Sequence, residues 1–187
     1  DDGGETWTDL TKNPGLGNTI KGKIGVSAGI QPGMVWALFD TCDSVSVAEI
    51  DTENTSKTSG LFISEDYGNS WKHVNNDSIL TTRPHYYNHV FADTKDPNTV
   101  YILSNMFWKS IDAGKSFELL ETTHYDQHDL WIDPRNPNRM INGHDGGASV
   151  SFNQGASWST INNQPTAEFY HLTADNQTPY RIYATQQ

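Results

Sequence analysis

The 187-residue sequence has a single cysteine, Cys42, so an internal disulfide and a cluster of thiolate metal ligands are both excluded. Basic residues are also scarce, since 12 Lys and Arg stand against 23 Asp and Glu, for a formal net charge of -11. A surface this acidic repels phosphate backbones, which argues against a nucleic-acid partner. No apolar run approaches the ~18 residues of a membrane-spanning helix, so no membrane span is predicted.

Helical periodicity is nearly absent, whereas turn-forming and aromatic residues are common. The chain has 15 Gly and 8 Pro, together with 6 Trp, 8 Tyr and 7 Phe. Short strands joined by tight turns are rich in Gly and Pro at the turns and in aromatic and β-branched residues within the strands. The composition therefore favours an all-β fold, and the chain is long enough for one domain with its own core.

A pattern of eight residues, Ser-x-Asp-x-Gly-x-Ser/Thr-Trp, recurs along the chain. It occupies Ser64–Trp71, Ser110–Phe117 and Ser151–Trp158, and Asp2–Trp7 repeats it without the first serine. The carboxylate can accept hydrogen bonds from N–H groups two or three residues on, the glycine permits positive φ, and the final ring can bury against a neighbouring layer. We name these segments the box turns and expect a structural role for Asp2, Gly4, Trp7, Ser64, Asp66, Gly68, Trp71, Ser110, Asp112, Gly114, Phe117, Ser151, Asn153, Gly155 and Trp158.

A second feature, two short strands around a proline turn, repeats with the same period. Pro97 precedes Asp112 by 15 positions and Pro137 precedes Asn153 by 16. The corresponding interval near the start is longer, and an insertion at 40–59 accounts for the surplus. Without it the repeat length is about 40–46 residues, which is typical of a four-stranded β-propeller blade. An outer fourth strand is expected to start at each box aromatic: Trp71, Phe117 and Trp158.

The predicted architecture is a single propeller segment of about three complete antiparallel blades, with partial blades at both ends. The expected units are 1–20, 21–76, 84–121, 124–162 and 168–187. A blade buries its faces only against its neighbours, so incomplete ends leave apolar surface open. Either the ends meet in a small four-blade ring, or the segment belongs to a larger ring completed by the rest of a longer chain or by self-association. The second arrangement is the expectation.

The box turns resemble the Asp-box, or bacterial neuraminidase, repeat of sialidases, xyloglucanase-type glycoside hydrolases and sortilin-type propellers. The segments 128–134, 139–143, 145–148 and 163–170 are similar to large secreted bacterial proteins with sortilin-like or glycosyl-hydrolase-like repeats. This resemblance implies a longer parent protein and an extracellular or periplasmic location. Sialidase activity is disfavoured, because the four arginines Arg83, Arg135, Arg139 and Arg181 do not form an assignable carboxylate-binding triad.

Two segments rich in functional side chains each precede an inner strand, so both are expected on one rim of the propeller and near each other. These rim loops are Arg83–His89 and His124–Asp129. His144-Asp145, in a turn after a second strand, is a third candidate that could lie on the opposite edge. The residues assigned to ligand binding are His85, Tyr86, His89, His124, Tyr125 and His128.

Three functions are considered for the rim residues: metal binding, glycoside hydrolysis and ligand recognition. Alternation of His124, Asp126 and His128 suits a metal, but no metal-ligand signature matches, so no metal or cofactor is predicted. Glycoside hydrolysis needs two opposed carboxyl groups, for which the catalytic candidates are Asp126, Asp129 and Asp145. Ligand recognition needs only hydrogen-bonding groups and aromatic platforms, and the platforms present are Tyr86, Tyr87, Trp108, Tyr125 and Trp131. Taken singly, Tyr87, Trp108 and Trp131 are each expected to pack between blades instead. The sequence favours recognition of a polysaccharide or a peptide, with an enzyme and a purely structural module as alternatives.

Overall fold

A computed structural model of the chain describes residues 3–42, 59–162 and 169–186. Within these ranges the protein is all-β, as predicted, with one short 3-10 helix, η1 (Ser78–Thr81). Most of the predicted insertion at 40–59 lies outside the described residues, as does the box residue Asp2.

The strands form antiparallel sheets in which chain neighbours pair. The first sheet has the order β1-β2-β3-β4 and the second β5-β6-β7-β8, while β9, β10 and β11 form a three-stranded sheet and β12 and β13 a hairpin. The bounds are β1 Ile20–Ala28, β2 Val35–Cys42, β3 Gly60–Ser64, β4 Lys72–Asn75, β5 His89–Ala92, β6 Val100–Leu103, β7 Phe107–Ser110, β8 Glu118–Leu120, β9 Gln127–Ile132, β10 Met140–His144, β11 Gly147–Ser151, β12 Phe169–Ala174 and β13 Ile182–Gln186.

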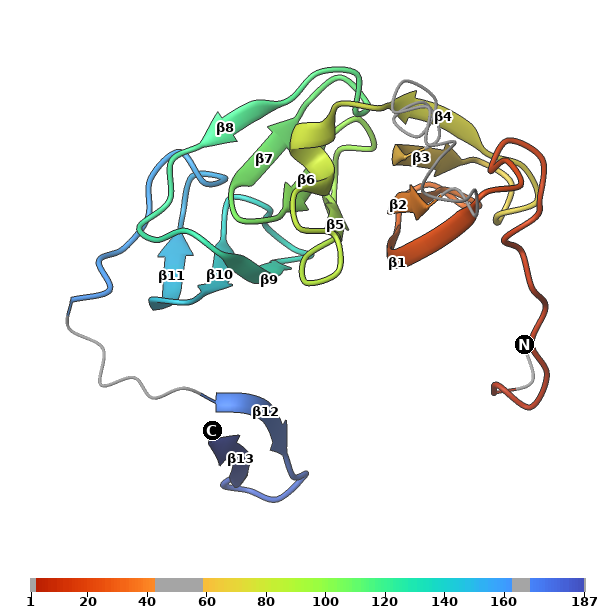
Figure 1. Ribbon diagram of the computed structural model, residues 1–187. Coiled ribbons are helices and arrows are strands. Elements are labelled where there is room, and N and C mark those ends of the chain that lie inside the picture. The colour runs from red at the N-terminus through yellow and green to blue at the C-terminus, as the bar shows by residue number, and fades with distance from the viewer. Residues whose placement is uncertain (1–2, 43–58, 163–168, 187) are drawn as a thin grey trace.

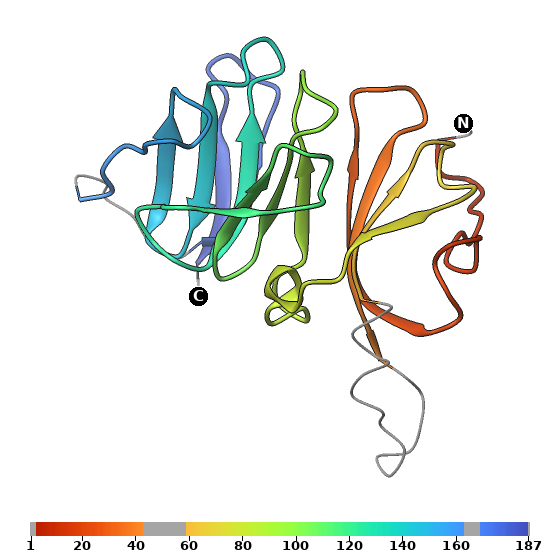
Figure 2. The same ribbon diagram turned by 90° about the horizontal axis from the view of Figure 1, so that it is seen from above.

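The three larger sheets stand side by side in an arc (Figure 1). Their first strands, β1, β5 and β9, lie on the concave side, and the last strands β4 and β8 lie on the convex side. The strand axes of the three sheets are roughly aligned with one another, although neighbouring strands are antiparallel (Figure 2). This is the radial blade arrangement of a β-propeller, and it places equivalent loops of successive sheets next to one another.

The predicted outer strand at Trp158 is not formed. The third sheet has three strands within the described residues, and Ser159 N donates to Val150 O at 2.9 Å without a regular ladder following. The Val150 N–H donates to the Ser159 hydroxyl at 3.0 Å. A side-chain oxygen therefore takes the place of the backbone carbonyl that would accept this N–H in a continuing strand ladder. The predictions at Trp71 and Phe117 are confirmed, because β4 and β8 begin one residue after each ring.

The box turns share one hydrogen-bond arrangement. In the box turn Ser110–Phe117, the Ser110 hydroxyl donates to Asp112 at 2.8 Å and accepts the N–H of Gly114 at 2.9 Å. The Asp112 carboxylate accepts the N–H and the hydroxyl of Ser116 at 3.0 and 2.6 Å. The acceptor therefore reaches four residues on, further than predicted, because Ala113 and Gly114 both have positive φ, 60° and 81°, and fold the turn back over the carboxylate.

Asparagine fits the same turn with one bond reversed. Asn153 accepts the N–H of Ser157 at 2.9 Å through its carbonyl oxygen, and its amide nitrogen donates to the Ser157 hydroxyl at 2.9 Å. At the N-terminal box, Trp7 Nε1 donates to Gly4 O at 2.9 Å, as Trp71 Nε1 does to Gly68 O at 3.0 Å. Trp7 is nevertheless 89% exposed, so the burial predicted for box aromatics does not extend to it.

Two of the other box aromatics pack at the interfaces between neighbouring sheets. Phe117 packs on a buried cluster that joins the first and second sheets, and Trp158 packs on one that joins the second and third. The first of these clusters contains Trp36 and Leu38 from β2 against Val90 and Ile102 from the second sheet. Burying such side chains contributes about 1.5–3 kcal/mol each. The interfaces between sheets therefore hold the arc together.

The box turns and the rim loops occupy opposite edges of the sheets. Each described box turn after the first bonds the turn that joins its sheet's first two strands, as Ala113 N does to Asn98 O at 2.8 Å. The recurrent aspartates of those first turns cap backbone groups: Asp93 accepts the N–H of Lys95 and Asp133 that of Arg135. These carboxylates therefore stabilise the turns. The loops that enter β5 and β9 lie at the other edge.

Candidate ligand-binding site

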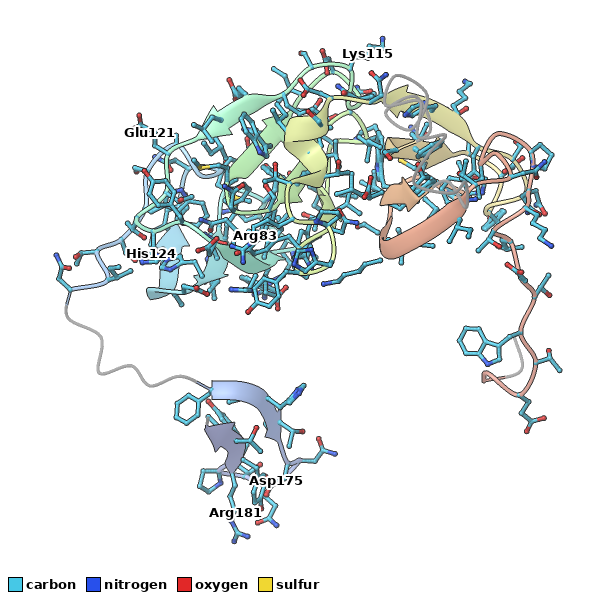
Figure 3. All side chains as sticks on the ribbon, in the orientation of Figure 1. Arg83, Lys115, Glu121, His124, Asp175 and Arg181 are labelled. Atoms are coloured by element: carbon cyan, nitrogen blue, oxygen red, sulfur yellow. The ribbon has the colours of Figure 1, made fainter. Side chains whose placement is uncertain are left out.

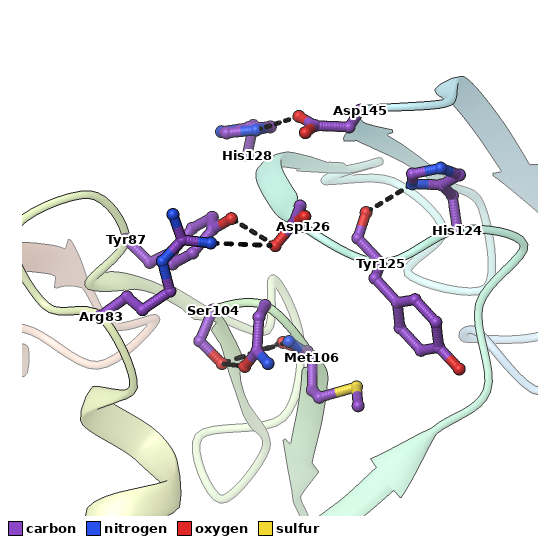
Figure 4. Close-up of polar contacts among 10 residues, drawn as sticks. Arg83, Tyr87, Ser104, Met106, His124, Tyr125, Asp126, His128 and Asp145 are labelled. Atoms are coloured by element: carbon purple, nitrogen blue, oxygen red, sulfur yellow. Dashed lines mark hydrogen bonds and ion pairs between the residues drawn. The ribbon is translucent and has the colours of Figure 1, made fainter.

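The two predicted rim loops meet. The Tyr87 phenol donates to the Asp126 carboxylate in a short hydrogen bond, and Arg83 Nη1 lies 3.9 Å from the same oxygen (Figure 4). Tyr87 is 1% exposed, whereas the side chains of Arg83 and Asp126 are 56% and 31% exposed. The loops belong to neighbouring sheets, so the propeller packing brings together residues that are distant in sequence.

Three residues of these loops have a left-handed backbone conformation. Arg83, Asn88 and Asp126 have φ of 52°, 83° and 60°. Among the described residues the other non-glycine positions with positive φ are in the box turns. Left-handed φ is uncommon for side-chain-bearing residues, and it persists where the surroundings impose it, often at functional sites. In the box turns the repeated hairpin requires this conformation, so the rim loops are where it can mark a functional site.

Tyr86 forms the exposed face of the cluster. Its ring is 47% exposed and stands edge-on to Tyr87 and His128, with centroids 5.1 and 5.5 Å apart. The Arg83 guanidinium lies 5.8 Å from the Tyr86 centroid and 5.6 Å from that of Tyr87. Lys23 Nζ, from β1, donates to Tyr86 O at 2.7 Å, so all three larger sheets contribute to this surface.

The turn at His144-Asp145 lies on the same edge, not the opposite one. Strand β10 runs antiparallel to β9 and His144 pairs with Gln127, so the end of β10 meets the start of β9. Asp145 Oδ1 is 2.6 Å from His128 Nε2, and these side chains are 52% and 35% exposed. The pair extends the rim cluster into the third sheet (Figure 4).

His124 and Tyr125 face away from the Arg83–Asp126 pair. His124 Nδ1 lies 2.8 Å from Tyr125 O, and its ring stacks on His144 at 5.6 Å. The Tyr125 ring is 65% exposed and points away from Tyr87 and His128 (Figure 4). The rim therefore presents two aromatic surfaces, of which only Tyr86 adjoins the charged groups.

The two remaining predicted ligand-binding histidines differ in exposure. His85 is exposed, whereas His89 is half-buried at the start of β5. Burial lowers the pKa of His89, and the nearby charge of Lys23 lowers it further. His89 is thus held neutral at neutral pH.

The aromatic residues Trp108 and Trp131 are not part of the rim cluster. Trp108 packs against the buried cluster between the first and second sheets, which confirms the packing role considered for it. Trp131 is 47% exposed on β9 beside its strand partner Ile141, which is 43% exposed. It lies on the face of the third sheet turned away from the second.

Neither metal chemistry nor glycoside hydrolysis is favoured by this geometry. His124, Asp126 and His128 turn toward different partners, and no group of three or more His, Cys, Asp or Glu positioned for a metal occurs in the described residues. The three candidate carboxylates make contacts within the protein: Asp126 with Tyr87, Asp145 with His128 and Asp129 with Leu130 N. None of these contacts sets two of the carboxyl groups facing each other, as a glycoside hydrolase requires.

A buried polar network lies below the rim and was not predicted from the sequence. Gln127, 0% exposed, donates to the carbonyl of His124 at 2.5 Å and accepts from Asn142 at 2.6 Å. His144 Nε2 lies 2.9 Å from the Ser149 hydroxyl, but Ser149 is fully buried and cannot act as a nucleophile on an outside substrate. The sequence did carry a signal for this network, namely polar residues at strand positions that should face a core.

Comparison with known proteins places the fold. The family model described as "Sortilin-Vps10: Sortilin, neurotensin receptor 3" matches residues 59–187. The GH74 xyloglucanase of Xanthomonas campestris superposes with a TM-score of 0.59 at 14% identity, over 92% of this chain and 28% of that one. The GH74 enzyme of Niastella koreensis gives 0.56 at 13% identity, over 87% and 25%. Identities this low establish the propeller fold alone.

The chain spans about a quarter of the length of these two solved structures. No curated protein matches the sequence. In the described part of the chain, no helix has the length and apolar character needed to cross a membrane.

Proposed function

The chain belongs to the Sortilin-Vps10 family, and we propose that it is a ligand-recognition segment of an exported propeller protein that binds a polysaccharide or a peptide at its rim. The observation that carries the proposal is the convergence of Arg83, Tyr86 and Asp126 from two loops held in left-handed backbone conformations. Ligand sites in propeller folds gather on loops at one edge, because a rigid scaffold positions them there. The units expected at 1–20, 21–76, 84–121, 124–162 and 168–187 are proposed to be parts of such a scaffold.

Recognition without catalysis accounts for the site better than hydrolysis does. An exposed ring beside charged donors and acceptors is sufficient to hold a sugar face or a peptide side chain. The carboxylates are already engaged by Tyr87 and His128, which orients them as acceptors for a ligand. Export is proposed on the family membership together with the resemblance of the repeats to secreted proteins.

Binding assays with two substitutions at the rim and one at the opposite edge test this function. The native chain is incubated with immobilised glycan and peptide libraries, and a retained ligand is then titrated by calorimetry. Tyr86→Ala should weaken binding at least tenfold while leaving the melting temperature nearly unchanged, since the ring is half exposed. Tyr125→Ala measures the contribution of the second aromatic surface.

Tyr67→Ala provides the matched control. Tyr67 is 71% exposed in a box turn on the opposite edge, and Ala113 occupies the same turn position with nearly the same φ, 60° against 62°. The substitution therefore removes an exposed ring without new backbone strain. Equal losses of binding in Tyr86→Ala and Tyr67→Ala would show that the ligand does not use the rim, and no retention from either library would refute recognition altogether.

A further inference from the structure

The Arg83 side chain already occupies an arrangement suited to a cation. Its guanidinium lies within 6 Å of the centroids of Tyr86 and Tyr87, where the negative faces of aromatic rings attract positive charge. The Asp126 carboxylate adjoins it, and His128 of β9 with Asp145 of the turn after β10 stands nearby (Figure 4). We call the space bounded by Tyr86, Tyr87 and Asp126 the cation seat.

The contact between Arg83 and this seat is weak. The nearest approach of guanidinium to carboxylate is 3.9 Å, longer than a charge-assisted hydrogen bond, and the Arg83 side chain is 56% exposed. Exposed pairs of this kind contribute little, because water screens them and the long side chain loses rotamer freedom. Arg83 also has a left-handed φ of 52°. Its side chain can therefore leave the seat at little cost.

The walls of the seat, by contrast, are fixed. Tyr87 is buried and its hydroxyl bonds Asp126, so ring and carboxylate hold each other in place. The ring of Tyr86 rests edge-on against Tyr87 and His128, and Lys23 bonds its carbonyl. A preorganised site with a loosely held occupant favours an incoming group of the same chemistry that can bond more closely.

Charge selects the ligand class. The chain carries a formal net charge of -11, and three carboxylates, Asp126, Asp129 and Asp145, belong to the rim loops and the adjoining turn. Such a surface attracts cationic ligands over a Debye length and repels acidic ones. A neutral sugar would gain nothing from this field, whereas a guanidinium could pair with a carboxylate in two parallel hydrogen bonds.

We propose that the cation seat receives an arginine or lysine side chain of a basic peptide, which displaces the side chain of Arg83. This inference rests on the proposed recognition function and assigns its ligand class. Removing Arg83 should then strengthen binding, since the competitor within the chain is gone. Removing the walls should weaken it.

Fluorescence anisotropy with two matched peptides provides the test. The first probe is a fluorescein-labelled, end-blocked peptide with alternating Gly and Arg, and the second replaces each Arg by citrulline, which keeps the shape without the charge. The native chain should bind the arginine peptide at least tenfold more tightly at 0.15 M salt. Asp126→Asn, which retains an αL-tolerant residue, should weaken binding about tenfold.

Two variants of equal charge change separate the seat from general attraction. Arg83→Ala should bind the arginine peptide about fivefold more tightly than the native chain. Lys115→Ala changes the net charge by the same amount at an exposed position on the convex side (Figure 3), and it should alter binding less than twofold. Equal tightening in both variants would overturn the proposal, as would weaker binding by Arg83→Ala or equal affinity for the citrulline peptide.

Failure of this inference can be told apart from failure of the proposed function. If a neutral glycan binds the native chain and is lost in Tyr86→Ala, while the arginine peptide does not bind, the rim recognises ligands but the cation seat does not select a basic peptide. If neither glycans nor peptides bind, recognition itself is refuted.

Discussion

The phenol of Tyr87 donates a hydrogen bond to the carboxylate of Asp126, 39 residues further along the chain. This bond joins the rim loop of the second sheet to that of the third. Burial raises the pKa of Tyr87, and the Asp126 charge raises it further, so the phenol stays protonated as a donor through the physiological range. The strained φ of Asp126, 60°, is imposed where this contact is made.

Tyr87→Phe should lower the free energy of unfolding by about 1–3 kcal/mol, because it removes a donor to a charged acceptor beside the core. Urea denaturation measures the loss. Tyr125→Phe is the control, since that ring is 65% exposed and points away from the cluster, and its effect should stay within about 0.5 kcal/mol. Equal stability of the two variants would mean that the Tyr87–Asp126 bond contributes nothing net.

Gly114→Ala should destabilise the fold more than an alanine placed at a glycine in open space. A Cβ there would lie 2.6 Å from Leu61 Cδ2, in the interface of the first two sheets, and φ is +81°. Left-handed strain of about 1–2 kcal/mol adds to about 1–3 kcal/mol of overpacking. Gly17→Ala isolates the first of these, because φ is +66° and a Cβ would meet nothing within 4 Å. If chemical denaturation finds the two variants equally stable, the box glycine does not hold the sheets at this separation.

Asp112→Asn should flatten the acid dependence of stability without unfolding the chain. Hydrogen bonds from the Ser116 hydroxyl and N–H, with one from Ser110, lower the Asp112 pKa to about 2. Since the folded pKa lies below the unfolded value of about 3.9, the carboxylate stabilises the fold above that value, and the contribution is lost as pH falls toward 2. Asn153 shows that an amide fits the turn.

Melting temperatures of the native chain and Asp112→Asn, compared from pH 5 to pH 2, test this linkage. The difference between the two curves isolates Asp112 from other carboxylates with a lowered pKa, such as Asp66 and Asp133. The native chain should lose its advantage as the pH falls. Parallel curves across the whole interval would contradict the assignment.

The sequence was sufficient to predict the sheets because their signals are local. Each box turn is a complete unit in which Ser, Asp and Gly make their bonds within a few residues, so the pattern alone predicts the hairpin. Strand placement then follows from the repeat. The strand expected after Trp158 failed for a reason that is also local, since the Ser159 hydroxyl replaces a backbone partner, but a single serine does not reveal this in advance.

The candidate site was only partly predictable, because its contacts are non-local. The repeat was enough to place the two rim loops on one edge, whereas the pairing of Tyr87 with Asp126 depends on how neighbouring sheets twist and pack. The side of the His144-Asp145 turn could have been inferred from strand direction, since the end of β10 must meet the start of β9. The position of Arg83 between ring faces and carboxylate depends on side-chain rotamers, which a sequence pattern does not encode.

His144 is a titratable residue of the buried polar network below the rim. Its Nδ1 accepts the N–H of Gly146 at 3.1 Å, so the ring proton is on Nε2, which faces the hydroxyls of Ser149 and Thr123 at 2.9 and 3.2 Å. Burial lowers the His144 pKa from 6.5, and the neighbouring His124 lowers it further. Protonation would break the Gly146 bond and place a charge against the stacked ring of His124, 5.6 Å away.

The melting temperature of the native chain should therefore fall as the pH drops from 7.5 to 5.5. Because the folded pKa of His144 is below the unfolded one, the neutral ring stabilises the fold fully above about 6.5, and this contribution declines as pH falls below that value. His144→Gln should start lower at pH 7.5, since it loses the stacking, but show a shallower decline. The remaining slope includes His89, whose pKa burial also lowers. His85→Gln, at an exposed position on the same rim, should keep the native slope. Identical slopes for the native chain, His144→Gln and His85→Gln would show that folding does not favour the neutral form of His144.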